Sequence, residues 1–318
     1  MTIMWSFFVY NNQKLLLVDI FLNIASHILF NIMTRTRNPF VRPYLKWAGG
    51  KRQLEGEILP KCPKTFNTYY EPFVGAGAIF FALQPERAVI NDLNDQLCLT
   101  YIAIKDNVNE LIEQLKEHKN NNSKEYYYEL REKDREPVFD SFTTIQRAAR
   151  LIYLNKTCYN GLYRVNSMGQ FNTPYGRYQN PAIFDEEVLL AIHKYLQSAN
   201  ITIKNMSFEK SVEDAEKGDF VYFDPPYDSP NCTNFTGYQA GGFDHEQQIL
   251  LKDVLEDLTD RNVKCLMSNA ATDFIIDLFK NKTRNEFKIE TVRANRMIGS
   301  NLDSRGKVDE VLIRNYKL

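Results

Sequence analysis

The residues best suited to chemistry form the turn Asp224-Pro225-Pro226-Tyr227. This turn follows the apolar run Phe220–Phe223, which is typical of a central strand in a parallel sheet. Two prolines end the strand and make a rigid turn, so a carboxylate and an aromatic ring face the same small volume. The Asp224 carboxylate and the Pro225 carbonyl can each accept an N–H group of an exocyclic amine, and Tyr227 offers a ring on which a base can stack. We therefore expect an amine nitrogen to be directed at an electrophile here. A purely structural proline turn is the alternative.

A second candidate site is the glycine turn in Glu71-Pro72-Phe73-Val74-Gly75-Ala76-Gly77-Ala78. Gly75 and Gly77 let the backbone pass close beneath a ligand, although Phe80 stands where a dinucleotide fingerprint has its third glycine. Asp92 ends the next predicted strand, where a carboxylate can accept hydrogen bonds from both hydroxyls of a ribose. This combination predicts a cofactor that contains adenosine, without saying which one. A simple tight turn is the alternative.

A tryptophan lies between two lysines upstream, in Lys46-Trp47-Ala48-Gly49-Gly50-Lys51. Such a stretch can cover an adenine ring or grip a carboxylate. Taken alone it favours a surface loop with a packed tryptophan. It becomes a candidate for the cofactor site because of the two motifs that follow it.

The segment Ser141–Asn180 is basic, although the chain as a whole is balanced in charge. It has no Asp or Glu, and its five basic residues are Arg147, Arg150, Lys156, Arg164 and Arg177. If all five met DNA phosphates, the salt dependence of binding would have a slope of about −4.5. Between Thr157 and Asn166, Tyr, Asn, Leu and Arg side chains crowd a glycine-kinked turn, a mixture suited to wedging a base step and reading base edges. The segment predicts a nucleic-acid contact, with a chance basic surface loop as the alternative.

The expected elements place the first two motifs at the ends of strands. We expect strands over Thr68–Val74, Ala88–Ile90, Phe220–Phe223, Val263–Met267 and Val308–Ile313, and helices over Gln96–His118 and near 123–136 and 141–155. Strands that alternate with helices at both ends of the chain predict an α/β sheet, whereas the middle lacks that alternation. The expected organisation is a doubly wound core over 41–95 and 206–318, a helical insert over 96–205 and an N-terminal extension over 1–40.

The composition is that of an ordinary folded protein. Of 318 residues, 44% are hydrophobic and 25% charged, which excludes a disordered chain, a collagen-like repeat and a coiled-coil rod. The net charge of −1 argues against a protein that coats nucleic acid by bulk charge. The five cysteines are scattered, so we expect neither a zinc site nor a disulfide framework, and a reducing cytoplasm as the compartment.

The N-terminal part contains one long apolar stretch, over residues 15–33. It is nearly long enough to span a bilayer, but Asp19, Asn23 and His27 interrupt it. It lacks the basic start and the cleavage site of a signal peptide, and Met33 begins a polar run like an ordinary N-terminus. We expect residues 1–32 to be a mis-assigned or dispensable extension. A packed amphipathic helix and a membrane segment are the alternatives.

Taken together, these motifs resemble the Dam-type, D12 class DNA adenine-N6 methyltransferases, and most closely those that modify GATC in restriction–modification systems. The resemblance covers about residues 43–316, with KWAGGK, EPFVGAG, INDLN, the recognition segment and FDPPY in the family's order. It implies a Rossmann-like S-adenosylmethionine-dependent methyltransferase core with an inserted helical DNA-recognition subdomain. The expected reaction is direct in-line methyl transfer to a flipped adenine in duplex DNA, without a metal.

The resemblance also implies roles for single residues. The positions that match cofactor contacts are Trp47, Lys51, Gly75, Gly77, Asp92 and Asp224. The turn from Asp224 to Tyr227 would hold the flipped adenine. In the recognition hairpin, Arg164 would read a guanine, and Tyr159 and Asn160 would open and fill the base step. Leu162 and Pro174 would make apolar contacts to bases, and the residues facing phosphates would be Lys156, Asn166 and Arg177.

Other readings stay open at this point. The same pocket suits methylation of cytosine N4, of a glutamine amide or of an RNA base. A nicotinamide-dependent dehydrogenase would also use a glycine turn and a distal acid, but it gives the proline turn no purpose. A non-catalytic DNA-binding module predicts that Asp224→Ala changes nothing. We expect double-stranded DNA as the partner, no membrane association, and a genetically linked restriction endonuclease that forms no stable complex with the chain.

Overall fold

The computed structural model of the protein describes residues 37–228, 243–295 and 307–318. The prediction for the N-terminal extension, with its apolar stretch over residues 15–33, lies outside these ranges. Inside them, no helix is long and apolar enough to cross a membrane. Residues from Pro39 to Leu318 form one unit by their contacts, and the elements below belong to it.

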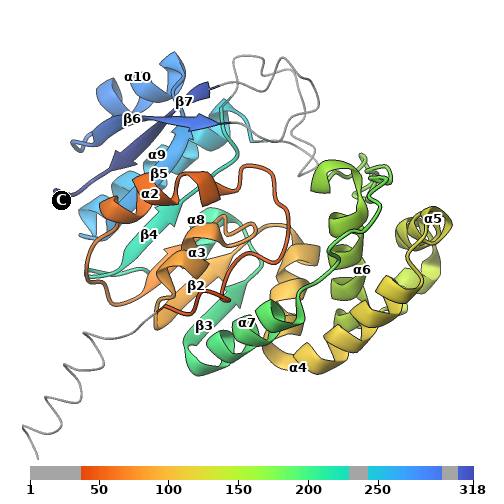
Figure 1. Ribbon diagram of the computed structural model, residues 1–318. Coiled ribbons are helices and arrows are strands. Elements are labelled where there is room, and N and C mark those ends of the chain that lie inside the picture. Colours follow the sequence, from red (N-terminus) through yellow and green to blue (C-terminus); the bar gives the residue numbers. More distant parts are fainter. Residues whose placement is uncertain (1–36, 229–242, 296–306) are drawn as a thin grey trace, which may run out of the picture. The chain divides into compact units, whose positions relative to one another are not determined.

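A seven-stranded sheet forms the centre of the described chain (Figure 1). In chain order its strands are β1 (Tyr69–Glu71), β2 (Arg87–Asn91), β3 (Asn200–Lys204), β4 (Phe220–Phe223), β5 (Lys264–Ala270), β6 (Lys288–Asn295) and β7 (Lys307–Arg314). Their order across the sheet is β3-β2-β1-β4-β5-β7-β6. The first five are parallel, and β7 pairs antiparallel with both β5 and β6. The expected α/β sheet with Rossmann-like winding is confirmed.

Helices cover both faces of the sheet. The longer ones are α4 (Asp95–Asn120), α5 (Lys124–Glu132), α6 (Thr144–Thr157), α7 (Glu186–Ser198), α9 (His245–Asp260) and α10 (Asp273–Asn281). The short ones are α2 (Glu55–Ile58), α3 (Ala78–Leu83) and α8 (Phe208–Ser211), and the single 3-10 turns are η1 (Lys51–Gln53), η2 (Leu59–Lys61), η3 (Lys133–Arg135), η4 (Pro137–Ser141) and η5 (Tyr159–Gly161). Polar residues cap the long helices: the Asn94 side chain accepts from the Leu97 N–H at the start of α4, and Thr143 with Gln146 forms a capping box on α6.

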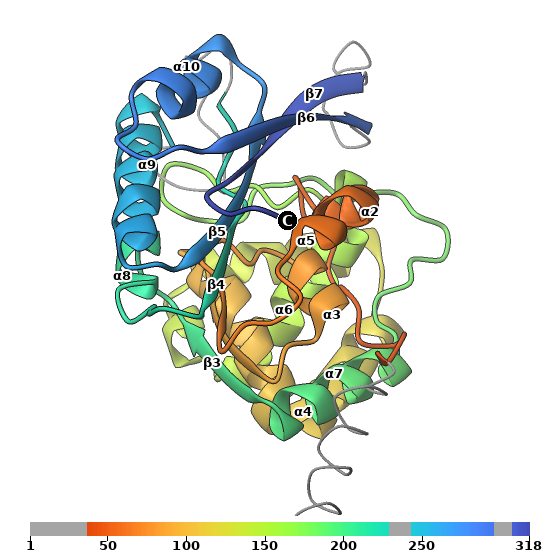
Figure 2. The same ribbon diagram turned by 90° about the vertical axis from the view of Figure 1, so that its left-hand side faces the viewer.

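Alternating residues of the central strands pack into two separate hydrophobic cores. Tyr69 and Tyr222 pack with α3, α4 and α7, whereas Val221 and Phe223 pack with α8, α9 and α10. Figure 2 shows α8, α9 and α10 together on one side of β4 and β5. This burial on both faces explains why the strands have almost unbroken apolar sequences.

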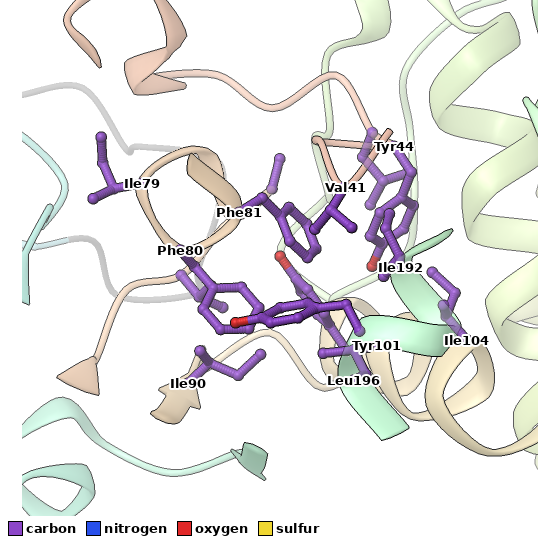
Figure 3. Close-up of a cluster of buried hydrophobic side chains, with 14 of the residues drawn as sticks. Val41, Tyr44, Ile79, Phe80, Phe81, Ile90, Tyr101, Ile104, Ile192 and Leu196 are labelled. Carbon is purple, nitrogen blue, oxygen red and sulfur yellow. The ribbon is translucent and has the colours of Figure 1, made fainter. Parts of the chain in front are cut away.

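Figure 3 shows part of the first core, around α3 and α4. Phe80 and Phe81 of α3 meet Tyr101 of α4 there, and Phe80 is fully buried and packs on Tyr195 of α7. The position where a dinucleotide fingerprint has its third glycine therefore holds a core aromatic residue. That is why this motif keeps only two glycines.

Two expectations differ from the structure. The first strand ends at Glu71 rather than Val74, because Pro72 cannot continue the hydrogen-bond ladder. The second difference is β3, which lies within the range expected to be a helical insert and pairs in parallel with β2. The edge of the sheet thus comes from residues 200–204, so a helical insert would end before them. That the rest of 96–205 forms a separate subdomain stays a prediction.

Candidate active site

A cavity of about 1010 Å³ opens at the carboxyl ends of the parallel strands. The chain runs from β1 outward to β2 and β3 and then crosses to β4 on the other side of β1, so the winding reverses between β1 and β4. Ligands of open α/β sheets bind at such reversals. The segments that line the cavity include 47–51, 71–76, 91–94, 206–209, 224–228 and 270–272. The cavity therefore brings together the proline turn, the glycine turn and the upstream lysine-tryptophan stretch, which are far apart in sequence.

Asp224 lies at the wall of this cavity, directly after β4. The Lys51 ammonium is 2.8 Å from Asp224 Oδ1, and the Ser268 hydroxyl donates to the same oxygen at 3.0 Å. Within the described residues these two contacts go to Oδ1, which leaves Oδ2 to accept from a ligand. Burial raises the pKa of Asp224, whereas the Lys51 charge and the Ser268 hydrogen bond favour the ionised carboxylate.

Tyr227 is held by its hydroxyl group. The hydroxyl donates to Glu310 Oε2 at 2.6 Å, and the Lys51 ammonium lies 4.3 Å from the ring centroid. Burial and the neighbouring carboxylates raise the pKa of Tyr227 well above its ordinary value, so the residue stays a phenol that can donate. The ring is thus fixed in place and presents an aromatic surface beside Asp224.

Asp92 and Gly75 lie together in the wall of the cavity. Asp92 Oδ2 accepts from the Gly75 N–H at 3.1 Å and Oδ1 accepts from the Asn94 N–H at 2.9 Å. Burial raises the pKa of Asp92 to about 6. Gly75 has φ 50°, and a Cβ atom there would lie 2.9 Å from Trp47 Cδ1, so the turn tolerates no side chain.

Gly77 differs from the other predicted cofactor residues, because it does not line the cavity. Its φ is 74°, and a Cβ atom there would lie 2.7 Å from the Tyr101 hydroxyl. That hydroxyl donates to the Gly75 carbonyl at 2.9 Å. Gly77 thus makes room for the residue that supports the turn from below.

Sequence reasoning missed an apolar wall of the cavity made of three phenylalanines. Phe73, Phe208 and Phe243 have ring centroids 5.2 to 5.9 Å apart, and all three line the cavity. Phe208 follows β3, so overlooking β3 also hid this wall. Its only sequence signal is an aromatic residue shortly after a strand.

Buried polar groups around the proline turn were also missed. Ser268 on β5 and Glu310 on β7 are polar residues inside apolar strands, and both are buried. Ser268 also lies 2.9 Å from the Tyr222 hydroxyl, which completes a hydrogen-bonded chain to Asp224. Glu71, which accepts from the Tyr69 hydroxyl, lines the cavity as well. A polar residue in an otherwise apolar strand was the available signal.

The predicted recognition residues lie on a hairpin after α6, outside the cavity lining. Bridges between Cys158 and Tyr175 and between Val165 and Phe171 join its two arms. Tyr159 is 47% exposed at its start, and Asn160 next to it adopts φ 56°. Leu162 is half-buried, whereas the exposed positions include Arg164, Pro174 and Arg177. The Arg164 guanidinium donates to Asn172 Oδ1 at 2.7 Å across the hairpin.

Two of the five basic residues are structural, which corrects the interpretation of the charge pattern. Arg150 is 4% exposed, forms an ion pair with Asp134 at 2.9 Å and donates to the Leu130 carbonyl. Arg147 donates to the carbonyls of Phe139 and Phe142. With three basic residues left, the upper bound on the salt slope falls to about −2.7.

Two residues predicted to contact phosphates, Lys156 and Asn166, also interact within the protein. Burial, followed by the nearby Lys46 charge, lowers the pKa of Lys156 to about 8. Asn166 Oδ1 accepts from the N–H groups of Met168 and Gln170, which closes the turn of the hairpin. Phosphate contacts by these residues stay predictions. Among the described residues, no group of three His, Cys, Asp or Glu side chains is arranged to hold a metal ion.

Comparison with known proteins identifies the family. The family described as D12 class N6 adenine-specific DNA methyltransferase matches residues 47–298. The chain is 45% identical to the type II methyltransferase M1.LlaDCHI of Lactococcus lactis subsp. cremoris, over 87% of this chain and 96% of that relative. It is 40% identical to the type II methyltransferase M.MjaIII of Methanocaldococcus jannaschii, over 87% and 99%. It is 35% identical to the DNA adenine methylase of Escherichia coli K12, over 85% and 94%. The chain therefore belongs to the D12 class and is an adenine-specific DNA methyltransferase.

Proposed function

We propose that this member of the D12 class transfers a methyl group from S-adenosylmethionine to N6 of a flipped adenine, and that its target is GATC in duplex DNA. The observation that carries the proposal is the position of the proline turn. It opens into the same cavity as the carboxylate of Asp92 and the ion pair between Lys51 and Asp224.

The cavity suits S-adenosylmethionine by size and by chemistry. Its volume of about 1010 Å³ exceeds what one cofactor needs and leaves room for a base. Asp92 can accept from the ribose hydroxyls, the three phenylalanines Phe73, Phe208 and Phe243 offer apolar surface to an adenine ring, and Trp47 covers the glycine turn. The bound cofactor would supply a methyl group on a sulfonium. When the methyl–sulfur bond breaks, the neutral thioether is the leaving group, and the methylated amine releases one N–H proton to Asp224 or to solvent.

The proline turn would hold the target amine. Asp224 Oδ2 and the Pro225 carbonyl accept the two N–H groups, which turns the nitrogen lone pair toward the methyl group. Tyr227, fixed by Glu310, provides the surface on which the base stacks. The residues orient the amine and exclude water, so direct in-line transfer needs no covalent intermediate on the protein. A base inside a duplex cannot reach this cavity, which is why we include flipping in the proposal.

The recognition hairpin would read the DNA. We propose that Arg164 pairs with a guanine, a contact for which its guanidinium fork is suited. Tyr159 and Asn160 would open and fill the base step, with Leu162 and Pro174 against bases. The phosphate contacts would come from Lys156, Asn166 and Arg177. The GATC target is supported by the agreement of the motifs with GATC-modifying methylases.

Two relatives are named type II methyltransferases, and this supports a role beside a genetically linked restriction endonuclease. No stable complex with that endonuclease is part of the proposal. A DNA substrate also supports the cytoplasm as the compartment of the proposed activity.

Mass spectrometry of nucleosides tests the proposal. A GATC duplex is incubated with the protein and S-adenosylmethionine, then digested to nucleosides. N6-methyladenine is the expected product. N4-methylcytosine, or the absence of any methylated nucleoside from an enzyme that binds the cofactor, would contradict the proposal.

A further inference from the structure

Asn155 joins two segments that the proposed function uses separately. It lies near the end of α6 and is fully buried. Its Oδ1 accepts from the Lys46 N–H at 2.9 Å, and its Nδ2 donates to the Lys46 carbonyl at 2.7 Å. The same Nδ2 donates to the carbonyl of Gly161 in the recognition hairpin at 3.1 Å. One carboxamide thus pairs with both backbone groups of Lys46 and reaches the hairpin.

The two segments also pack without spare room at this place. Gly161 has φ 66°, and a Cβ atom there would lie 2.6 Å from the Lys46 Cβ. Any side chain at Gly161 would push the Lys46 segment away from the hairpin. The close approach and the three hydrogen bonds therefore define one spacing between the segments.

That spacing sets the position of Trp47. The Trp47 ring stacks on Tyr163 of the hairpin with ring centroids 5.1 Å apart and an angle of 27° between the planes. Trp47 also packs against the glycine turn, because its Cδ1 atom lies 2.9 Å from the position that a Cβ atom on Gly75 would occupy. The indole thus lies between the glycine turn and the hairpin, and a shift of the Lys46 segment would change both contacts.

We propose that Asn155 is a positioning residue that holds the Lys46–Trp47 segment against the recognition hairpin, so that the bound cofactor and the target base are aligned. The inference rests on the proposed function, because it gives the cavity to the cofactor and the hairpin to the DNA. Without the carboxamide, the backbone groups of Lys46 and the Gly161 carbonyl lose a partner, and the two segments can separate. A shift of this kind lowers the rate of transfer and weakens the distinction between target and non-target DNA.

The test compares Asn155→Ala and Asn155→Asp with a matched control. Asn155→Asp keeps the shape of the side chain but puts a carboxylate oxygen in place of the Nδ2 donor, opposite the carbonyls of Lys46 and Gly161. The control is Asn315→Ala, because Asn315 uses its carboxamide in the same way, accepting from the Cys265 N–H and donating to the Val263 carbonyl, away from the cavity and the hairpin. The measurements are Tm, the Kd of S-adenosylmethionine, kcat and KM on a GATC duplex, and the same constants on a duplex with the guanine replaced.

We expect both Asn155 variants to lose about tenfold or more in kcat, and in the ratio of kcat/KM between the two duplexes. Asn315→Ala should lose a similar amount of Tm and keep the wild-type kcat and ratio. Wild-type kcat and ratio in a folded Asn155 variant would overturn the inference.

If neither Asn155 variant folds, Tyr163→Leu tests the same alignment at the ring stack, where unchanged kcat and ratio would overturn it. The wild-type enzyme is measured first. Failure of the wild type to methylate adenine rejects the proposed function, whereas an active wild type with unaffected variants rejects only the role of Asn155.

Discussion

Lys51 and Asp224 form an ion pair of 2.8 Å at the wall of the cavity, and Lys51 is only 5% exposed. Neither residue has its partner nearby in sequence, and each belongs to a different motif. The pair links the stretch beside the glycine turn to the turn that would hold the target amine. The Lys51 charge also favours the ionised form of the buried Asp224 carboxylate, and a charged carboxylate accepts stronger hydrogen bonds from an amine.

Removing Lys51 should move the acid side of the pH–rate profile. Burial already raises the pKa of Asp224, and the Lys51 charge opposes that rise, so Lys51→Met raises this pKa further. The ionised carboxylate is present above its pKa and is lost as the pH falls through it. The acid limb of kcat, measured at saturating cofactor, should therefore move to higher pH. Lys61→Met is the control, because Lys61 pairs with Glu290 outside the cavity lining. An unchanged acid limb would show that Lys51 does not control Asp224.

Cofactor binding should depend on the protonation of Asp92. Its pKa is raised to about 6 by burial, and only the ionised form accepts from both ribose hydroxyls in full strength. Binding should be complete above that pH and weaken as the pH falls through it, by about tenfold at pH 5. Calorimetric titration with S-adenosylmethionine measures this. Asp92→Asn should bind weakly at every pH, whereas Asp95→Asn, which changes an exposed residue outside the cavity lining, should behave as wild type. A pH-independent Kd in the wild type would refute the role of Asp92.

Glu310 and Tyr227 should act as one unit in a double-mutant cycle. Tyr227→Phe removes the donor and Glu310→Ala removes the acceptor of the same 2.6 Å hydrogen bond. Each change should lower kcat by about tenfold, which corresponds to about 1.4 kcal/mol for a hydrogen bond to a charged group. The double variant should be no slower than the slower single variant. Fully additive losses would mean that the two residues act independently. Glu290→Gln, on β6 and remote from the cavity lining, is the control.

Arg164 and Arg177 should have different effects on DNA binding. Arg164→Ala should cost about 1–3 kcal/mol of discrimination at one guanine, with less effect on other sequences. Arg177→Ala should weaken binding equally on all sequences and reduce the salt slope by about one. Binding titrations at several salt concentrations, on duplexes with single base changes, separate the two. A uniform loss for Arg164→Ala would show that it contacts only phosphate.

Arg150 should affect stability and leave the salt slope unchanged. It is buried, pairs with Asp134 and donates to the Leu130 carbonyl. Arg150→Met leaves these buried acceptors without one donor, although Arg135 still pairs with Asp134, and should cost about 1–3 kcal/mol of unfolding free energy. Urea unfolding measures the loss. If Arg150→Met is stable and its salt slope falls by one, Arg150 contacts a DNA phosphate and the structural role is wrong.

The positions of the glycine turn and the proline turn could be predicted from the sequence because each turn follows an apolar strand. Asp92 and Asp224 had to meet at one edge once β2 and β4 were recognised as parallel strands. The strand β3 was not recognised, because it is short and directly follows a helical segment. Its sequence is Asn-Ile-Thr-Ile-Lys, and only one of its residues is buried in the structure. The cavity wall at Phe208 was lost with it.

Long-range partners could not be predicted from local patterns. Nothing near Arg150 indicates that Asp134 will neutralise it, so a buried structural arginine looked like a phosphate contact. In the same way, the contact between Asn155 and Lys46 joins residues that only the fold brings together. Charge patterns predict where a segment is basic, but burial decides which of its charges reach a ligand.

The most direct test of the central claim measures transfer of label from tritiated S-adenosylmethionine to three duplexes, which contain GATC, GTAC or no adenine, with wild type and Asp224→Ala. We expect label in the GATC duplex alone, and its loss in the variant while cofactor binding persists. Label that persists in Asp224→Ala, or wild-type transfer to the duplex without adenine, would contradict the claim that this cavity methylates adenine through Asp224.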